Sequence, residues 1–331
     1  MRPLLLGIVL LICLGFFSMA NIAFGEPELP LSEVLGILIG YESSEPMYSL
    51  IVSHRLNRTL LALFAGGALS TAGLILQVYF RNPLAGPGVL GVTSGASLGV
   101  AVVVLGGLSL GTVQGDVMIV LAGIIGAMGI IALLLLASKY IRNNISLLVL
   151  GLMFSYFTSA FVNTLFLGAS EMSTRKYVMW GLGSFEGVPM SQLVIIIPIV
   201  LALTFMLLAF SKSLNGMVLG ESYARSMGVS TRGLKWAVIL VAGILAGLIT
   251  AYCGPIGFVG VAVPQLIRLG VKSTQHVHLI PLAFIGGAFL CVLADFIVRY
   301  SGNQLPVNAV TALAGAPIVI YIIFRLNKRS V

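Results

Sequence analysis

The side chains that most often carry out chemistry in proteins are scarce in this sequence. Its three histidines are His54, His276 and His278, and no His-Glu-x-x-His pattern occurs. His276 and His278 lie two residues apart, which provides too few ligands for a metal, so we expect both to be solvated loop residues. The sequence contains no Gly-Lys dipeptide, which excludes a nucleotide-binding P-loop. We therefore predict no metal site, no cofactor and no catalytic residue in this chain.

Asp295 is the one acidic residue inside an apolar run, and Arg299 follows four residues later on the same face of a helix. We expect a local ion pair between them near the outer membrane surface, with a proton-coupling site as the alternative. Carriers driven by protons or sodium commonly place carboxylates near the middle of the bilayer. The shortage of such groups disfavours an ion-coupled secondary transporter and an intramembrane enzyme. It favours a membrane pathway whose energy comes from another subunit.

The composition places the chain in a membrane. Of its 331 residues, 59% are apolar and 8% are charged, whereas an average soluble domain is about 25% charged. The mean hydropathy is +1.10. These values exclude a soluble enzyme, a disulfide scaffold and a disordered chain. Three cysteines lie inside apolar runs without metal or redox spacing, so we expect buried, inert thiols. They are Cys13, Cys253 and Cys291.

Apolar segments of about 20 residues, the length that a membrane-spanning helix needs, occur ten times. We therefore predict an all-α, polytopic membrane protein with about ten transmembrane helices in a single domain, residues 1–331. The eighth segment is short and follows the Gly-Pro-Ile-Gly run at 254–257, so counts of nine or eleven stay open. The first segment resembles a secretory signal but is long enough to span, and we expect a retained helix. The segments are 4–25, 59–79, 89–110, 117–137, 145–168, 191–211, 236–252, 256–270, 279–298 and 306–325.

The placement of charges on these segments predicts the orientation. Ten spans put both termini on one side, and most of the 18 lysines and arginines fall on that side, which identifies it as cytoplasmic. The net charge of +8 therefore reflects membrane topology rather than nucleic-acid binding. Glu221 is the one acid on the cytoplasmic side. The basic residues on the outer side are Arg55, Arg58, Arg175, Lys176 and Arg299.

Four polar stretches marked by glycine or proline lie at the predicted membrane boundaries. They are His54-Arg55-Leu56-Asn57-Arg58-Thr59-Leu60, residues 77–96 with Arg81-Asn82-Pro83-Leu84-Ala85, residues 219–229, and residues 254–268 with Gly257-Phe258-Val259-Gly260. In this order, from about residue 50 to the C-terminus, they resemble the permeases of ABC importers for iron-siderophores, haem and cobalamin. The resemblance implies a type II importer permease of the cell inner membrane. The partners it implies are a second permease copy, as a homodimer, two cytoplasmic ATPase subunits that hold ATP and magnesium, and a periplasmic binding protein.

The cytoplasmic loop at about 211–235 is the predicted place for a partner. Its stretch from Gly220 to Gly228 can form a short helix that Gly228 ends as a C-cap, with Glu221 near the favourable N-terminus. The resemblance implies two short helices here that press into the ATPase. On that basis Glu221, Ala224, Arg225 and Gly228 are the predicted coupling residues. An ordinary solvated loop is the alternative.

The outer arginines are candidates for docking the binding protein. Arg55 and Arg58 lie three residues apart, so a helix presents them on one face. The resemblance implies that Arg55, Arg58 and Arg299 pair with carboxylates of the binding protein, and charged rims of this kind steer docking. Anchors that snorkel to the membrane surface are the alternative. The outer segment 169–189 is expected to form an interfacial helix whose Arg175 and Lys176 extend the same rim.

The predicted gate lies where Pro83 prevents the second span from continuing. The resemblance places this hinge near the cytoplasmic mouth of the pathway, which makes Asn82 and Leu84 gate candidates, with a simple tight turn as the alternative. In the fifth span, Asn163 and Thr164 are polar enough to line the pathway or to make packing hydrogen bonds.

The sequence departs from the resemblance at two positions. Gln265 stands where the family usually has histidine, and Asn308 stands where it has glycine. Neither departure affects the expected fold. Both prevent the cargo from being inferred from close relatives.

Overall fold

The computed structural model of the chain consists of α-helices joined by short connections, with no strand in the residues that it describes. The described ranges are 3–41, 45–108, 113–141, 143–271, 273–302 and 304–327, so both chain ends lie outside them. The helices are α1 (Pro3–Ala23), α2 (Leu31–Ile39), α3 (Pro46–Phe80), α4 (Val92–Val104), α5 (Val113–Tyr140), α6 (Asn144–Phe166), α7 (Glu171–Gly181), α8 (Met190–Ala209), α9 (Ser211–Leu219), α10 (Glu221–Ser226), α11 (Thr231–Cys253), α12 (Val259–Gly270), α13 (His276–Tyr300) and α14 (Val307–Asn327).

Each of the ten predicted apolar segments lies on a helix, which confirms the all-α, polytopic architecture. The second segment, 59–79, is the later part of α3, which begins at Pro46. Among the described residues, seven helices are long and apolar enough to cross a membrane, whereas α4, α12 and the apolar part of α14 are shorter. The shortening has a local cause. α4 begins only after Gly91, whose φ is 76°, and α12 begins only after Phe258, whose φ is 64°. A left-handed residue cannot continue a right-handed helix, so it fixes the start of the next one.

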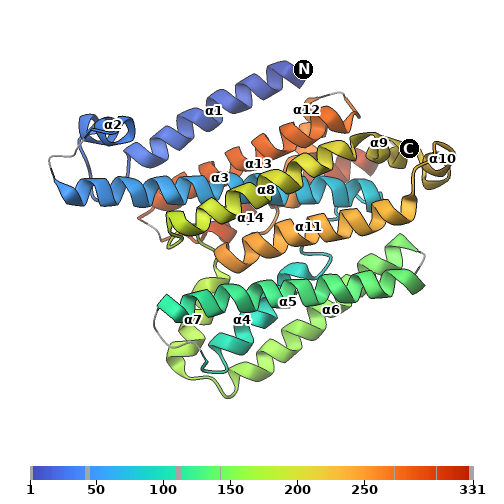
Figure 1. Ribbon diagram of the computed structural model, residues 1–331, viewed down its shortest axis with the longest axis horizontal. Coiled ribbons are helices and arrows are strands. Elements are labelled where there is room, and N and C mark those ends of the chain that lie inside the picture. Colours follow the sequence, from blue (N-terminus) through green and yellow to red (C-terminus); the bar gives the residue numbers. More distant parts are fainter. Residues whose placement is uncertain are drawn as a thin grey trace.

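The long helices run side by side along the length of the molecule (Figure 1). α1 starts at the end that carries α9 and α10, which we call the α10 end. α2 and α7 lie toward the opposite end, which we call the α7 end. The predicted coupling loop and the predicted docking rim are thus separated by the length of the bundle.

α3 is the central helix, and it contacts α13, α11 and α12. Its packing depends on glycines that bring two backbones together. A side chain at Gly66 would collide with the backbone of Gly287 in α13, and one at Gly73 would collide with Gly260 in α12. Small residues at these crossings permit the close approach that stabilises helix pairs in membranes.

The helices α4 to α7 form a second group beside the first (Figure 1). α4 packs between α5 and α6, and α11 joins the two groups because it contacts both α5 and α3. Here too the approach is close, since Gly95 and Gly99 in α4 face Gly126 and Ala122 in α5 without room for a side chain.

This packing predicts different effects for two glycine-to-alanine substitutions. Gly66→Ala should lower the free energy of unfolding by about 1–3 kcal/mol, because the new methyl group meets the backbone of Gly287. Gly129→Ala in α5 is the matched control, because no atom lies within 4 Å of its added carbon, and it should be neutral or slightly stabilising. Thermal unfolding of the two purified variants measures the difference. Equal melting temperatures would contradict the proposed α3–α13 contact.

Candidate functional site

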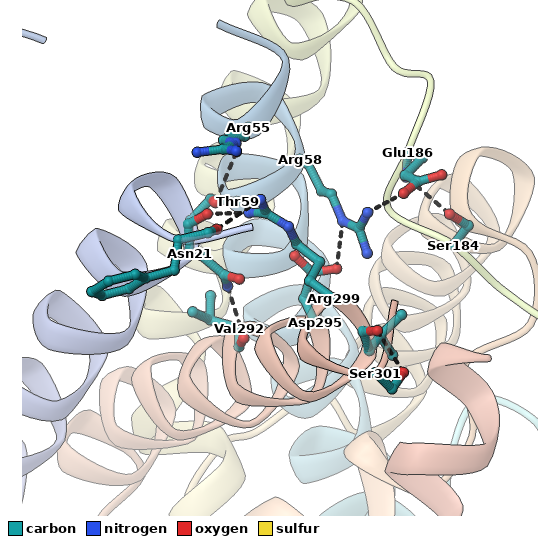
Figure 2. Close-up of polar contacts among 12 residues, drawn as sticks. Asn21, Arg55, Arg58, Thr59, Ser184, Glu186, Val292, Asp295, Arg299 and Ser301 are labelled. Atoms are coloured by element: carbon teal, nitrogen blue, oxygen red, sulfur yellow. Dashed lines mark hydrogen bonds and ion pairs between the residues drawn. The ribbon is translucent and has the colours of Figure 1, made fainter. Parts of the chain in front are cut away.

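A buried ion pair joins α3 to α13 at the α7 end. The Nε of Arg58 donates to Oδ1 of Asp295 at 2.7 Å, and Nη1 of the same arginine pairs with Glu186 in the segment between α7 and α8. Figure 2 shows the Arg58 guanidinium between the two carboxylates. Arg58 is 5% exposed and Asp295 is fully buried, whereas Glu186 is 42% exposed.

The sequence analysis predicted that Asp295 pairs with Arg299, and this prediction is wrong, because Asp295 pairs with Arg58. Arg299 turns instead to the end of α1, where Nη1 donates to the carbonyl of Asn21 and Nη2 donates to that of Phe24 at 2.8 Å. The last carbonyls of a helix have no intrahelical donor, and a guanidinium satisfies them well.

Arg55 acts on the same helix end. Its two terminal nitrogens donate to four carbonyls at distances of 2.7–3.2 Å. These carbonyls belong to Ile22, Ala23, Gly25 and Pro27. Arg55 and Arg299 together therefore hold the end of α1 and the turn that follows it against α3 and α13.

The expectation of an exposed arginine rim is thus incorrect for Arg55 and Arg58, which are 3% and 5% exposed. Their guanidinium groups are engaged within the chain, because a helix end and a buried carboxylate need donors where water is absent. A docking role for Arg55, Arg58 and Arg299 remains a prediction.

α7 confirms the short helix predicted between residues 169 and 189. Tyr177 packs edge-on against Phe166 at 5.5 Å between ring centroids, and burial raises the pKa of Tyr177 above its usual value. Lys176 pairs with Asp116 at 3.2 Å, while Arg175 is exposed. Both cations reach the surface, and Arg175 is the more exposed, because Lys176 is 35% exposed and paired with Asp116.

The α10 end contains two short helices, α9 and α10, and α10 coincides with the predicted helix between Gly220 and Gly228. Both glycines have positive φ, 133° and 79°, a conformation that glycine adopts most easily. Nη2 of Arg225 pairs with Oε1 of Glu221 at 2.6 Å, one turn apart. Ala224 is buried against Gly216 of α9, so it sets the packing of the two helices instead of facing a partner.

Next to the exposed pair of Arg225 and Glu221, these helices also expose large apolar side chains, which the sequence analysis did not detect. The large side chains there are Val218, Leu219, Tyr223 and Met227. Hydrophobic periodicity in the sequence does not reveal such a patch, because α9 and α10 are too short to show it.

His276 contradicts the prediction of a solvated loop histidine. It is the first residue of α13 and is 1% exposed. Its backbone N–H donates to Oδ1 of Asn215 in α9 at 2.9 Å, and its Nδ1 lies 2.6 Å from the same oxygen. The contact joins α9 to α13. His278 is exposed as expected, but it too lies in α13 and not in a loop.

The hinge after α3 is a tight turn, which was one of the two interpretations of this segment in the sequence analysis; the other was a gate. Arg81 ends α3 with a φ of 48°, and Oδ1 of Asn82 accepts the N–H of Leu84 at 2.9 Å. Such an asparagine-stabilised turn needs no other support. Leu84 also lines a mainly apolar cavity of about 440 Å³. The cavity walls include Leu69, Val89, Ile256, Phe258, Val261, Asn308 and Val319. The gate itself remains a prediction.

Asn163 and Thr164 do not line this cavity. Both are exposed on α6, and the Thr164 hydroxyl donates to Ala160 of its own helix at 3.1 Å. Within one chain the structure therefore does not bring them together with Asn82 and Leu84.

Three buried or half-buried amides next to the cavity have functions that sequence reasoning missed. Nε2 of Gln265 donates to Oε1 of Gln77 at 2.8 Å and to the Pro83 carbonyl at 3.2 Å. Oδ1 of Asn308 accepts the N–H of Gly257 at 3.0 Å. Gln265 and Asn308 are the two positions at which the sequence departs from the family pattern. Those departures were the sequence feature that could have pointed to these hydrogen bonds.

Comparisons with known proteins agree with this architecture. The model of the FecCD transport family matches residues 10–325. The chain is 32% identical over 331 residues to the hemin transport system permease protein HmuU of Yersinia pestis, which covers 99% of this chain and 98% of that protein. It is 34% identical over 277 residues to the vitamin B12 import system permease protein BtuC of Vibrio cholerae, covering 82% and 81%. A solved metal-chelate type ABC transporter in an inward-facing conformation superposes with a TM-score of 0.82 at 28% identity, covering 98% and 99%.

The buried network predicts a large effect at Asp295. Asp295→Ala should lower the free energy of unfolding by about 3 kcal/mol, because it removes the buried carboxylate that balances Arg58. The double variant Arg58→Met/Asp295→Leu should recover most of that loss, since both buried charges of the pair are removed together. Glu221→Ala is the matched control, because it breaks an exposed pair and should cost less than about 1 kcal/mol. Thermal unfolding in detergent compares the three, and equal losses for the two alanine variants would refute a stabilising buried pair.

Proposed function

The chain belongs to the FecCD transport family, and on this basis we propose that it is the membrane permease subunit of an ATP-driven importer for an iron complex, haem or cobalamin. The similarity to a hemin permease over nearly the full length of both chains is the observation that carries the proposal. The chain supplies a pathway and no chemistry of its own. ATP and magnesium would be held by partner subunits, because this sequence contains no P-loop.

We place all ten apolar helices across the inner membrane, with α4, α12 and α14 completing the crossings of the seven longer helices. The packing supports this placement, because α4 lies between α5 and α6, and α12 contacts α3, α13 and α14. Short helices with irregular ends are tolerated at membrane depth where protein surrounds them. The α10 end then faces the cytoplasm together with both termini, in accord with the distribution of lysine and arginine.

An ion-coupled secondary carrier is the alternative function, and the surroundings of Asp295 weigh against it. A coupling carboxylate must gain and lose an ion during each cycle. Asp295 is instead fully buried and paired with Arg58 at 2.7 Å. A carboxylate in this position stabilises the contact of α3 with α13.

The α10 end has the properties of a docking surface for the ATPase subunits. α9 and α10 project there and expose Leu219 and Met227, which are 68% and 60% exposed. Large apolar side chains that water surrounds in the free protein favour burial in an interface. Glu221, Arg225 and Gly228 would set the shape of this surface, and Ala224 would hold α10 on α9.

A second permease copy would account for two exposed polar residues of α6. Asn163 and Thr164 are exposed on this helix, where contact with lipid is unfavourable for the Asn163 amide. A dimer that covers this face would place both side chains along a pathway on its axis. Cargo would pass between the copies toward the cavity that Leu84 lines.

The binding protein would dock at the α7 end. Arg175 is exposed there, and the half-exposed Glu186 connects the surface to Arg58. Charged side chains at such a rim guide the approach of the partner more than they tighten the complex. Arg55 and Arg299 would contribute by keeping the end of α1 in place.

The ATPase proposal predicts the effect of charges in the apolar patch. Leu219→Asp and Met227→Asp should each weaken association with the partner ATPase by about tenfold, the loss expected for a central interface residue. Leu167→Asp is the matched control, because Leu167 is 89% exposed after α6 and away from α10. Co-purification at several ATPase concentrations measures the affinity. Equal binding by all three variants would rule out this surface.

The cargo is tested by uptake into proteoliposomes that contain this chain with its ATPase and its binding protein. We expect uptake of labelled haem, a ferric siderophore or cobalamin that requires ATP and continues without an ion gradient. The buried state of Asp295 predicts this independence from ion gradients. Uptake that follows a proton or sodium gradient in the absence of ATP would instead support the secondary carrier.

A further inference from the structure

α12 contains a proline that leaves a backbone carbonyl without its usual partner. Pro264 has no N–H, so the Gly260 carbonyl one turn earlier receives no helical hydrogen bond at this position. An unsatisfied carbonyl is costly where lipid and protein exclude water. Nε2 of Gln77 lies 3.3 Å from the Gly260 oxygen and 3.1 Å from the Val261 oxygen, and donates to both.

α3 can supply this donor because its backbone touches α12. A side chain at Gly73 would collide with Gly260, and Gln77 lies one helical turn further along α3 on the same face. The Gln77 side chain is 2% exposed. Pro264 therefore leaves a carbonyl free, Gly73 lets α3 approach it, and Gln77 supplies the donor.

Gln265 extends this link to the hinge. Its Nε2 donates to Oε1 of Gln77 at 2.8 Å and to the carbonyl of Pro83 at 3.2 Å. The hinge thus has two supports, its internal Asn82 turn and this bond from α12. The internal turn shapes residues 82–84, whereas the bond from Gln265 fixes where the turn lies relative to α12.

We propose that Gln77 and Gln265 form a latch that positions the Asn82–Leu84 hinge beside the cavity, and that the latch opens when the permease opens toward the cytoplasm. The second half of this proposal rests on the proposed function of the hinge as a gate. Leu84 and Val261 line the same cavity, so the latch joins its two walls.

The chemistry of the latch suits a contact that must break and reform. Hydrogen bonds between neutral amides contribute little net stability each, because the partners can exchange them for other donors and acceptors. The other end of α3 is different, since Arg58 and Asp295 form a buried ion pair that is costly to separate. α3 is therefore held firmly at the α7 end and reversibly at the hinge.

The positioning half of the proposal is tested by hydrogen exchange on the purified full chain, read by mass spectrometry. Gln265→Met keeps the length of the side chain and removes its donors, and it should accelerate exchange in residues 82–91 by about tenfold. Residues 211–229 should exchange as in the unaltered chain. Gln275→Met is the matched control, because Gln275 is an exposed glutamine just before α13. Gln265→His keeps an N–H donor and should restore slow exchange.

Two further variants keep this test decisive. If Gln265→Met accelerates exchange throughout the chain, Gln265→Asn replaces it, because a shorter amide withdraws the same donors with less change in polarity. In a latch that acts as a unit, Gln77→Met/Gln265→Met should exchange at 82–91 no faster than Gln265→Met alone. Unchanged exchange at 82–91 in a folded Gln265 variant would overturn the latch.

The gating half is tested with the reconstituted transporter. Gln265→Met should hydrolyse ATP but import about tenfold fewer cargo molecules per ATP, because the hinge no longer closes the cavity at the correct point in the cycle. Gln265→His should restore the ratio. Faster hinge exchange with an unchanged ratio would overturn the gating role. If the unaltered chain imports none of the three cargoes, the proposed function fails, while the exchange result still decides whether the latch exists.

Discussion

The structure depends on one constraint, which is that polar groups at membrane depth must find partners within the protein. α3 supplies most of these partners. Arg55 donates to the carbonyls at the end of α1, Arg58 neutralises Asp295 of α13, and Gln77 donates to the Gly260 carbonyl that Pro264 leaves without a helical partner in α12. A single helix thus satisfies polar groups of three neighbouring helices. This explains why it is the most deeply buried of the long helices.

Glycine contacts and polar contacts occupy different positions along α3. The glycines at 66 and 73 bring its backbone against α13 and α12. The polar contacts lie near the two ends and differ in kind. An ion pair holds the α7 end, whereas neutral amides hold the hinge end.

The cavity beside the hinge has mostly apolar walls, and no cluster of metal ligands occurs in the described part of the chain. For a pathway this is an advantage, because strong ligands would hold the cargo and slow its release. Family membership establishes the class of transporter. α9 contacts α13 through Asn215 and His276, so a movement of the α10 end reaches the helix that carries Asp295.

The sequence by itself predicted the ten apolar helices, their order, the turn at Pro83 and the helix between Gly220 and Gly228, because each follows from local composition and spacing. It did not predict α2. Only the tertiary structure decided which neighbour each polar side chain meets. Arg58 and Asp295 pair across 237 positions, and Gln77 and Gln265 across 188. The burial of Arg55 and His276 likewise depends on remote segments. Helical periodicity assigns a residue to a face of its helix, but the helix that covers this face is chosen by the packing of the whole chain.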